Sequence, residues 1–353
     1  MKFLKNIKIL KTTISEKKCF IVAEISANHS GNFFKLKKLI KEIKEAGADA
    51  IKIQAYEADT ITLNSNFKDF KISKKNTWSK FKTLYSLYKK AQTPFDWYPK
   101  IFEYCEKIKL PVFASVFDHT SLNYLEKINC PAYKIASPEI TDIPLIKSVA
   151  RTKKPIMISN GLANIKDLIL AVNTVKKEKN KKLIILKCTS AYPAPIDEIN
   201  LKTIQDIKKK FKCLVGYSDH SIGYNISIHA ASLGISVLEK HVCLKNSKTV
   251  DSFFSIDTEK LKKMIEIVRA NEISNGKIFY SVSKSSKINL NGRRSIYVTK
   301  DIRKGEIFSV NNIKSIRPSF GMHPKFYYKV IGKKSNSNIK SGFRLLWKYI
   351  KKK

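Results

Sequence analysis

Acidic, basic and imidazole side chains recur inside short apolar segments of this 353-residue chain. Glu24 lies in the first such segment, Lys52 in the second and Lys134 in the fourth. Charged side chains are costly to bury unless they are paired, so their recurrence in strand-like segments needs a common explanation. A shared polar site, built where several of these segments end, is the simplest one.

The last two apolar segments carry their polar residues in alternation. Ser218 and His220 stand two residues apart, as do Glu239 and His241, so each pair shares one face of a β-strand. If both faces turn inward, the two imidazoles project from neighbouring strands and can hold a divalent cation together with water. Imidazole ligands suit Mn²⁺ or Zn²⁺ better than Mg²⁺. Two satisfied core histidines are the alternative interpretation.

Lys52 and Lys134 admit three interpretations. They could clamp an anion as fixed positive charges, form a Schiff base as unprotonated amines, or pair structurally with a residue such as Glu24. Hydroxyl groups suited to phosphate or carboxylate oxygens accompany them in the neighbouring segments, at Ser137, Ser159 and Ser218. Several serines around two lysines favour the anion pocket.

Eight apolar segments alternate with amphipathic helical patterns between residue 19 and about residue 277. The expected strands are Cys19–Ala27, Ala50–Tyr56, Pro111–Phe117, Ala132–Ser137, Pro155–Gly161, Leu183–Ser190, Leu214–Asp219 and Ser236–Val242. A longer excursion, residues 60–99, follows the second strand. The alternation predicts an α/β fold, a closed (β/α)8 TIM barrel whose polar residues meet at the carboxyl ends of the strands. An open doubly wound sheet is the alternative, but no Gly-x-Gly-x-x-Gly element supports it.

The apolar periodicity fades after the last barrel unit. Residues 280–292 are rich in Ser, Lys and Asn, which predicts a linker between a barrel domain at 1–279 and a small β-rich domain at 293–353. Within the small domain, Asp301–Gly305 is echoed by Asn338–Gly342, a pattern that is compatible with a twofold internal repeat.

Composition limits the partners and the compartment. The formal net charge of +39 invites a nucleic-acid partner, but the lysines lie mostly on polar helix faces without interleaved aromatics, so we expect none. No apolar run reaches the roughly 20 residues that cross a bilayer, and the N-terminus lacks a signal-peptide pattern. The six cysteines show no C-x-x-C spacing and are expected as buried thiols. We therefore expect a cytoplasmic protein with no membrane partner.

Six segments, in order along the chain, resemble motifs of the sialic acid synthase family. They are Ala23–His29, Gly47–Gln54, Tyr133–Ser137, Cys188–Pro193, Gly216–His220 and Leu238–His241. The segment after residue 292 is similar to the antifreeze-like (SAF) domain of that family. Further details resemble the pseudaminic acid synthase branch, among them Thr93–Trp97, Glu139–Pro144 and Gly321–Pro324.

The resemblance implies an enzyme that condenses phosphoenolpyruvate with 2,4-diacetamido-2,4,6-trideoxy-L-altrose, giving pseudaminic acid and phosphate. A related amino-sugar, as used by N-acetylneuraminate or legionaminate synthases, is the alternative. The resemblance also implies a divalent metal, Mn²⁺ or Mg²⁺, on His220 and His241, and protons handled by Glu24 and Glu239. The resemblance implies that phosphoenolpyruvate is bound by Lys52, Lys134, Ser137, Ser159 and Ser218. It implies that Gln54, Tyr192 and Asp251 face the sugar. Ser190 is a further substrate-binding candidate.

The resemblance further implies a domain-swapped homodimer, in which the C-terminal domain reaches over the partner's barrel and delivers an arginine to the sugar. Arg294 best matches that arginine, and Arg293 is the competing choice. One stretch departs from the family pattern. Residues 245–250, just before Asp251, contain no glycine, so we expect a backbone shape there that differs from the family's and that decides whether Asp251 faces the sugar.

Overall fold

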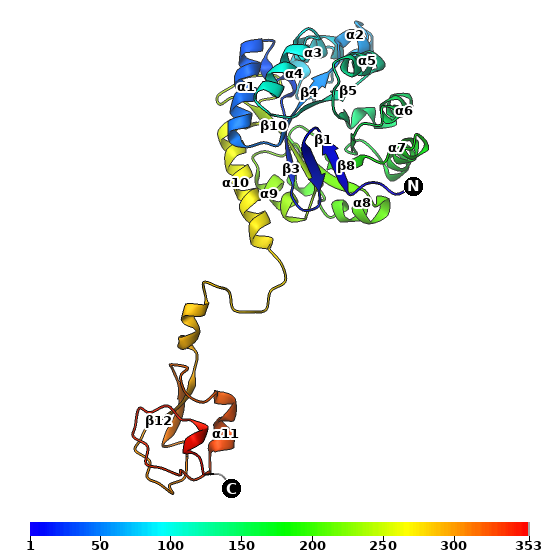
Figure 1. The fold of residues 1–353 in the computed structure, drawn as a ribbon. Helices are drawn as coiled ribbons and strands as arrows, with labels where there is room; N and C mark the ends of the chain where they lie inside the picture. Colours follow the sequence, from blue (N-terminus) through cyan, green and yellow to red (C-terminus); the bar gives the residue numbers. More distant parts are fainter. Residues whose placement is uncertain (352–353) are drawn as a thin grey trace. The chain divides into compact units, whose positions relative to one another are not determined.

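The computed structural model describes residues 1–351 and separates the chain into two compact units (Figure 1). The first unit is Met1–Gly276 and the second begins at Lys277. None of the helices in the described part of the chain combines the length and the apolar character needed to span a membrane. All six cysteines are buried free thiols, as expected from their spacing.

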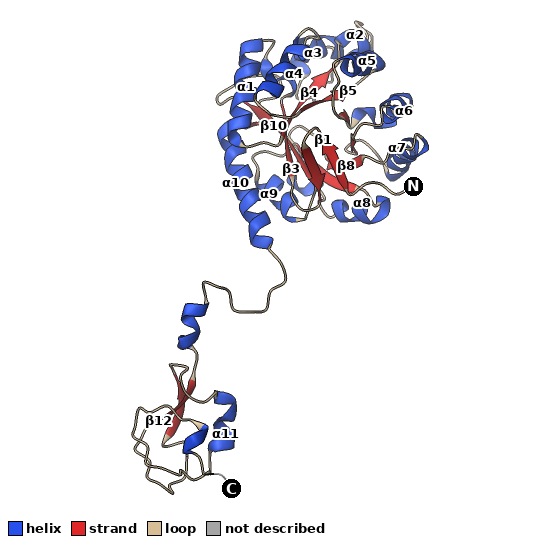
Figure 2. Cartoon of the chain, viewed as in Figure 1, coloured by secondary structure: helices blue, strands red, loops and turns tan. Residues whose placement is uncertain are grey.

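Eight parallel strands close the first unit into a barrel (Figure 2). They are β3 (Phe20–Glu24), β4 (Ala50–Ala55), β5 (Val112–Val116), β6 (Tyr133–Ile135), β7 (Ile156–Ser159), β8 (Leu183–Cys188), β9 (Leu214–Asp219) and β10 (Val237–Cys243). The ring closes because β10 pairs with both β9 and β3. The eight expected strands and the closed barrel are therefore confirmed, and the open doubly wound sheet is excluded. A short strand, β11 (Ile256–Asp257), adds to β10 outside the ring.

Helices follow the strands and cover the outside of the barrel (Figure 2). They are α1 (Phe33–Ala46), α4 (Trp97–Lys107), α5 (His119–Lys127), α6 (Ile143–Arg151), α7 (Ile165–Lys177), α8 (Thr203–Phe211), α9 (Asn225–Ser232) and α10 (Thr258–Asn275). Helix α1 shows how local residues fix where such a helix begins and ends. The Asn32 side chain accepts a hydrogen bond from the Lys35 amide at its start, and Gly47 ends it with φ of +91°.

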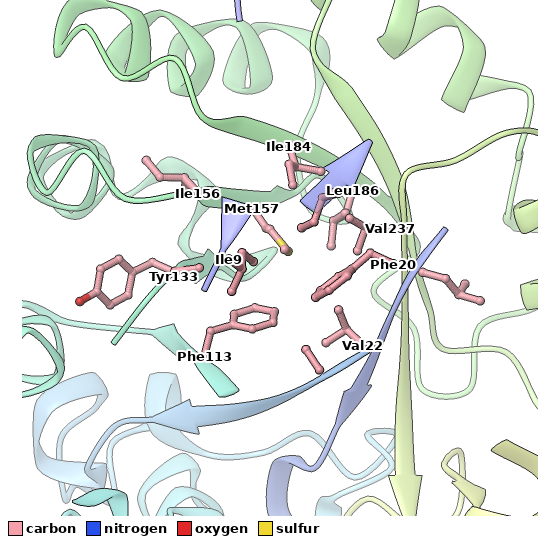
Figure 3. Close-up of a cluster of buried hydrophobic side chains, with 14 of the residues drawn as sticks. Ile9, Phe20, Val22, Phe113, Tyr133, Ile156, Met157, Ile184, Leu186 and Val237 are labelled. Atoms are coloured by element: carbon pink, nitrogen blue, oxygen red, sulfur yellow. The ribbon is translucent and has the colours of Figure 1, made fainter. Parts of the chain in front are cut away.

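A hairpin closes the amino-terminal end of the barrel. Its strands, β1 (Asn6–Ile9) and β2 (Thr12–Ser15), pair antiparallel. Figure 3 shows Ile9 among the side chains of Phe20, Phe113 and Met157, which stand near the starts of their strands. The hairpin therefore seals the barrel end opposite the carboxyl ends of the strands. The sequence analysis did not predict it, although the alternation of isoleucine with lysine and threonine is a strand signal.

The excursion after β4 contains only short elements. These are α2 (Ala58–Ile61), two 3-10 turns, η2 (Lys68–Phe70) and η3 (Ser79–Phe81), and α3 (Leu84–Ala91). Most of the segment is irregular and half-exposed, so its path depends on contacts with the barrel loops rather than on a core of its own.

The second unit is small and β-rich. Strands β12 (Ser295–Val298) and β13 (Ile313–Ile316) pair antiparallel, and a 3-10 turn, η6 (Lys287–Gly292), precedes them. The two echoed turns lie side by side: the Asp301 carboxylate accepts from the Ser341 amide at 2.8 Å, and the Asn338 side chain accepts from the Lys304 amide at 2.7 Å. The two hydrogen bonds join equivalent positions of the two echoed turns.

A buried ion pair joins the outward faces of β9 and β10. Lys240 Nζ lies 3.0 Å from Asp219 Oδ2, and both side chains have 0% exposure. Asp219 Oδ1 also accepts from the Ser221 amide and hydroxyl, and Ser227 of α9 donates to the same carboxylate. Because Asp219 and Lys240 each stand next to an inward-facing histidine in sequence, the pair fixes the two strands that carry those histidines.

Removing one member of this pair should destabilise the barrel. Lys240→Met leaves a buried carboxylate without its counter-charge, so we expect a loss of about 3–5 kcal/mol in the free energy of unfolding, measured by urea denaturation. Lys245→Met is the matched control, because its pair with Glu259 is more than half exposed and screened by water, so the urea midpoint should stay close to that of the wild type. A Lys240→Met protein as stable as the control would contradict the interpretation.

Candidate functional site

A cavity of about 440 Å³ opens at the carboxyl ends of the barrel strands. Its volume lies within the range of small-molecule sites. Eleven of the residues expected from the sequence line it: Lys52, Gln54, Lys134, Ser137, Ser159, Tyr192, Ser218, His220, Glu239, His241 and Asp251. Of the other candidates, Glu24 lies behind Lys52, Ser190 lies beside the cavity, and Arg294 belongs to the second unit.

The charged residues of the site form one buried cluster. Lys52 Nζ lies 2.9 Å from Glu24 Oε2 and 3.0 Å from Glu239 Oε2, and Lys134 Nζ lies 3.5 Å from Glu239 Oε1. No side chain in the cluster is more than 4% exposed. The barrel closure creates this contact, because β3 stands between β4 and β10 in the ring. The two ammonium groups and two carboxylates balance in formal charge.

Burial and charge divide the two carboxylates into different roles. Burial raises the pKa of Glu24, and Glu239 adds to that rise while Lys52 opposes it. Burial also disfavours the Glu239 carboxylate, but Lys134, Lys52 and a 2.8 Å hydrogen bond from Ser218 outweigh it and hold its pKa below the usual range. Glu239 is therefore held ionised, whereas Glu24 is the carboxyl group better able to keep a proton.

The two lysines also differ. Burial disfavours the Lys52 ammonium, but Glu239 and Glu24 outweigh burial and raise its pKa above the usual value. At Lys134 burial prevails, with the Lys52 charge in support, and the pKa is lowered. Lys52 is thus a permanent cation, and Lys134 is the cation that an incoming anion would stabilise most.

A cradle of hydroxyl and amide groups borders the lysines. Ser159 Oγ is buried and has no hydrogen-bond partner among residues 1–351. The Gly161 amide donates to Ser137 Oγ at 3.0 Å. A Cβ at Gly161 would lie 2.8 Å from Ser137 Oγ and would clash with Ser190 Oγ, so a larger residue would push both hydroxyls out of their places where the loops after β6, β7 and β8 meet. The sequence analysis did not single out Gly161, although a glycine just after a strand end is a signal of close approach.

The two histidines face each other across the cavity wall. Their ring centroids are 5.3 Å apart. His220 Nδ1 lies 3.0 Å from the Thr189 carbonyl, and His241 Nδ1 lies 3.2 Å from Ser26 Oγ, whose own proton goes to Asp251 Oδ2 at 2.7 Å. Both Nδ1 atoms must therefore donate, so in the neutral form of each ring the Nε2 lone pair is the one that can meet a ligand.

This donor set suits a catalytic rather than a structural metal. Partners that fix the tautomer of a histidine, as the Thr189 carbonyl and Ser26 do here, accompany metal-ligating imidazoles. Burial, with support from His220 and Lys52, lowers the pKa of His241 far below its usual value and keeps the ring neutral. No group of three or more His, Cys, Asp or Glu side chains is arranged to hold a metal in the described chain. Two nitrogens thus fit an ion whose other positions belong to water and substrate.

Tyr192 and Asp251 complete the wall beside the histidines. The Tyr192 and His220 ring centroids are 4.4 Å apart. Asp251 accepts from Ser26 Oγ and from the Ala27 amide, so the loop without glycines still brings it to the cavity. Asn246 takes the positive φ of 57° in that loop, a conformation that asparagine tolerates better than most residues.

Cys188 and Glu139 are among the cavity residues that were not predicted as site residues. Cys188 is a buried thiol, as expected, but it lines the cavity, and its Sγ lies 3.7 Å from His220 Nδ1. Burial opposes the Cys188 thiolate, but a protonated His220, together with Lys134 and Ser137, outweighs burial and lowers the pKa of the thiol to about 6. Burial opposes the His220 imidazolium, but Cys188 outweighs burial and raises the pKa of His220, so this ion pair and a metal on Nε2 of His220 are alternative states of the site. Glu139 also lines the cavity, and burial raises its pKa to about 7. Both residues open segments quoted for the family resemblance, Cys188–Pro193 and Glu139–Pro144, but neither was assigned a role there.

The excursion after β4 supplies much of the remaining wall, which the sequence analysis did not foresee. Its cavity-lining residues include Ile61, Lys71, Ile72, Ser73, Asn76, Trp78, Leu84, Leu87 and Tyr88. In the second unit, the exposed Arg294 donates from Nη1 to the Ser315 carbonyl at 3.0 Å, and Arg293 is also exposed.

Comparisons with known proteins agree with this site. The chain is 45% identical over 329 residues to a pseudaminic acid synthase of Campylobacter jejuni, an alignment that covers 93% of this chain and 95% of that protein. It is 41% identical to a pseudaminic acid synthase of Helicobacter pylori, with 91% and 94% covered. The crystal structure of the spore coat polysaccharide biosynthesis protein SpsE of Bacillus subtilis superposes with a TM-score of 0.66, at 29% identity and 99% coverage of both chains.

Family models match both units. The SAF domain model matches residues 293–350, as expected from the resemblance of that segment. The model of the NeuB family matches residues 39–280, more than half of the chain, which confirms the resemblance to sialic acid synthases. This chain therefore belongs to the NeuB family and carries a SAF domain after its barrel.

Proposed function

We propose that this chain is a pseudaminic acid synthase, which condenses phosphoenolpyruvate with 2,4-diacetamido-2,4,6-trideoxy-L-altrose and releases phosphate. The observation that carries the proposal is the buried cluster of Lys52, Lys134 and Glu239 beside an unpartnered serine hydroxyl. The Campylobacter and Helicobacter relatives that bear this name align over more than nine-tenths of the chain. A central metabolite as substrate and six free thiols both fit a cytoplasmic enzyme.

Phosphoenolpyruvate carries two anionic groups, a phosphate and a carboxylate, and the cavity offers two lysine ammonium groups that can bind them. Lys52 is held as a cation by Glu24 and Glu239, so it is a poor Schiff-base nucleophile. Lys134 lines the same cavity as Ser137 and Ser159. Hydroxyl and amide donors around two cations are typical of an anion site, which supports the clamp over the Schiff base.

The reaction forms one carbon–carbon bond and exchanges the C2–O bond to phosphate for a C2–O bond to water. C3 of phosphoenolpyruvate attacks the aldehyde carbon, and the aldehyde oxygen gains a proton. Water loses a proton as it adds to C2, and the resulting tetrahedral intermediate expels phosphate and loses its second hydroxyl proton to give the ketone. Glu24, whose raised pKa favours the protonated form, is suited to supply the proton. Glu239, held ionised, is suited to accept a proton from the attacking water.

NeuB-family synthases generally depend on a metal, and His220 and His241 are the residues that we propose to hold it through Nε2. The bound ion, for which we propose Mn²⁺ or Mg²⁺, would polarise the aldehyde. Tyr192, against His220, and Asp251, linked through Ser26 to His241, orient the two imidazoles from the other side. Gln54 in β4 and Ser190 after β8 are proposed as further substrate contacts.

The direct test of this function is an assay of a small panel of amino-sugars with phosphoenolpyruvate. We expect phosphate release that requires both substrates, and a nine-carbon acid of the mass of pseudaminic acid. Borohydride with pyruvate should trap no lysine adduct. Turnover of only N-acetylmannosamine or of the legionaminic acid precursor would show that the sugar is misassigned, and a trapped adduct would contradict the anion clamp.

The affinity for phosphoenolpyruvate should fall at alkaline pH because of Lys134. Its lowered pKa means that the ammonium loses its proton below the ordinary lysine range, so the positive charge that binds the anion is present at lower pH and lost as pH rises. We expect the alkaline limb of kcat/KM for phosphoenolpyruvate to move upward in Lys134→Arg, because guanidinium stays charged. If Lys134→Arg is active and the alkaline limb of its kcat/KM profile is unchanged, the loss of affinity at high pH comes from a group other than Lys134.

The C-terminal arginine is testable by mixing inactive variants. We propose a homodimer in which Arg294 of one subunit serves the barrel of the other. Coexpressed Arg294→Ala and His241→Ala chains should then regain about a quarter of the wild-type activity, because half of the dimers are mixed and each has one intact site. Arg293→Ala is the matched control and should be active alone. A mixture without activity would place Arg294 in its own subunit's site, and activity of Arg294→Ala alone would place Arg294 outside catalysis.

A further inference from the structure

The excursion after β4 crosses the mouth of the barrel. We name residues 61–88 the roof segment. Thr77 Oγ1 donates to the Tyr192 carbonyl at 3.1 Å, and Trp78 Nε1 donates to the Val250 carbonyl at 3.1 Å. Tyr192 follows β8, which stands four strands from β4 in the eight-stranded ring and therefore opposite it. The roof segment thus starts on one side of the mouth and is fastened on the other.

The cavity has two chemically different ends. The strands supply lysines, glutamates and serines, whereas the roof segment supplies mainly apolar side chains. Those that line the cavity are Ile61, Ile72, Trp78, Leu84, Leu87 and Tyr88. The roof segment contributes no carboxylate to the lining, and its polar lining residues are Lys71, Ser73 and Asn76.

Trp78 sets the position of this apolar wall. Its ring packs against Tyr192 at a centroid distance of 5.2 Å and against Phe253 and Phe254 at 5.9 and 6.5 Å. Its indole nitrogen holds the backbone of Val250, the neighbour of Asp251. One side chain therefore joins the roof segment to both loops that carry the expected sugar contacts.

The proposed reaction orients the sugar between the two ends. Its aldehyde carbon must meet phosphoenolpyruvate among the lysines and histidines, so its distal carbons extend toward the roof segment. We infer that the roof segment selects a 6-deoxy sugar: its apolar wall receives the C6 methyl group, and Trp78 positions that wall. This inference rests on the proposed function and adds to it the residues that choose the substrate. A C6 hydroxyl would lose water there without gaining a partner from the apolar wall.

A matched pair of substrates tests the inference. They are 2,4-diacetamido-2,4,6-trideoxy-L-altrose and the same sugar with a hydroxyl group at C6. We expect wild-type kcat/KM to favour the 6-deoxy sugar by roughly 10- to 100-fold, the size of discrimination that an apolar pocket achieves. Leu84→Asn should lower that ratio about tenfold and leave the KM for phosphoenolpyruvate unchanged. Ile72→Asn, at a second half-exposed position of the wall, should act in the same direction.

Leu63→Asn is the matched control, because Leu63 belongs to the roof segment but is 63% exposed and does not line the cavity. It should keep the wild-type ratio. Trp78→Phe retains a ring but removes the donor to Val250, so it should raise the KM for the sugar alone. Equal use of both sugars by the wild type, or a ratio unchanged in both wall variants, would overturn the inference while leaving the synthase function intact. Absence of condensation with either sugar would overturn the proposed function and the inference with it.

Discussion

The structure depends on the balance of four charges buried at one end of an apolar barrel. Lys52 stands between the carboxylates of Glu24 and Glu239, and Lys134 reaches Glu239 from the other side. Isolated, each charge would be costly in this setting, but within the cluster Lys52 and Glu239 stabilise each other's charged forms, whereas burial favours the neutral forms of Glu24 and Lys134. The closed ring makes the cluster possible, because the first and last barrel strands are neighbours.

Because side chains alternate along a strand, the residues that line the cavity and the residues that hold the strands together lie on opposite faces of the same strands. On β9 and β10 the inward residues enter the cavity, whereas the outward Asp219 and Lys240 form an ion pair with 0% exposure. The His241 imidazole is also held by hydrogen bonds, because its Nδ1 contacts Ser26 Oγ, which in turn donates to Asp251. Each ring nitrogen that faces the protein has a partner, and the nitrogen that remains is the one that can serve a ligand. The same hydrogen bonds therefore fix both the position and the tautomer of the two imidazoles.

Most of the fold and much of the site follow from local patterns in the sequence. Period-two spacing identified Ser218 with His220 on one inward face, and polar residues at strand ends identified Lys52, because a barrel brings all strand ends together. The hairpin at residues 6–15 and the role of Gly161 were missed, and the excursion at residues 60–99 was predicted without its contribution to the cavity wall. Their roles arise from contacts between distant parts of the chain, such as the hydrogen bond from Trp78 to Val250, which no local pattern encodes.

The central claim is that the buried lysine and glutamate cluster is the site for phosphoenolpyruvate. Calorimetric titration of phosphoenolpyruvate into the enzyme, at alkaline pH and in two buffers of different ionisation enthalpy, tests it most directly. An anion placed beside Lys134 raises the lowered pKa of that group, so binding should take up protons from the buffer. The uptake should vanish in Lys134→Arg. Tight binding without proton uptake, or uptake that persists in Lys134→Arg, would contradict the account.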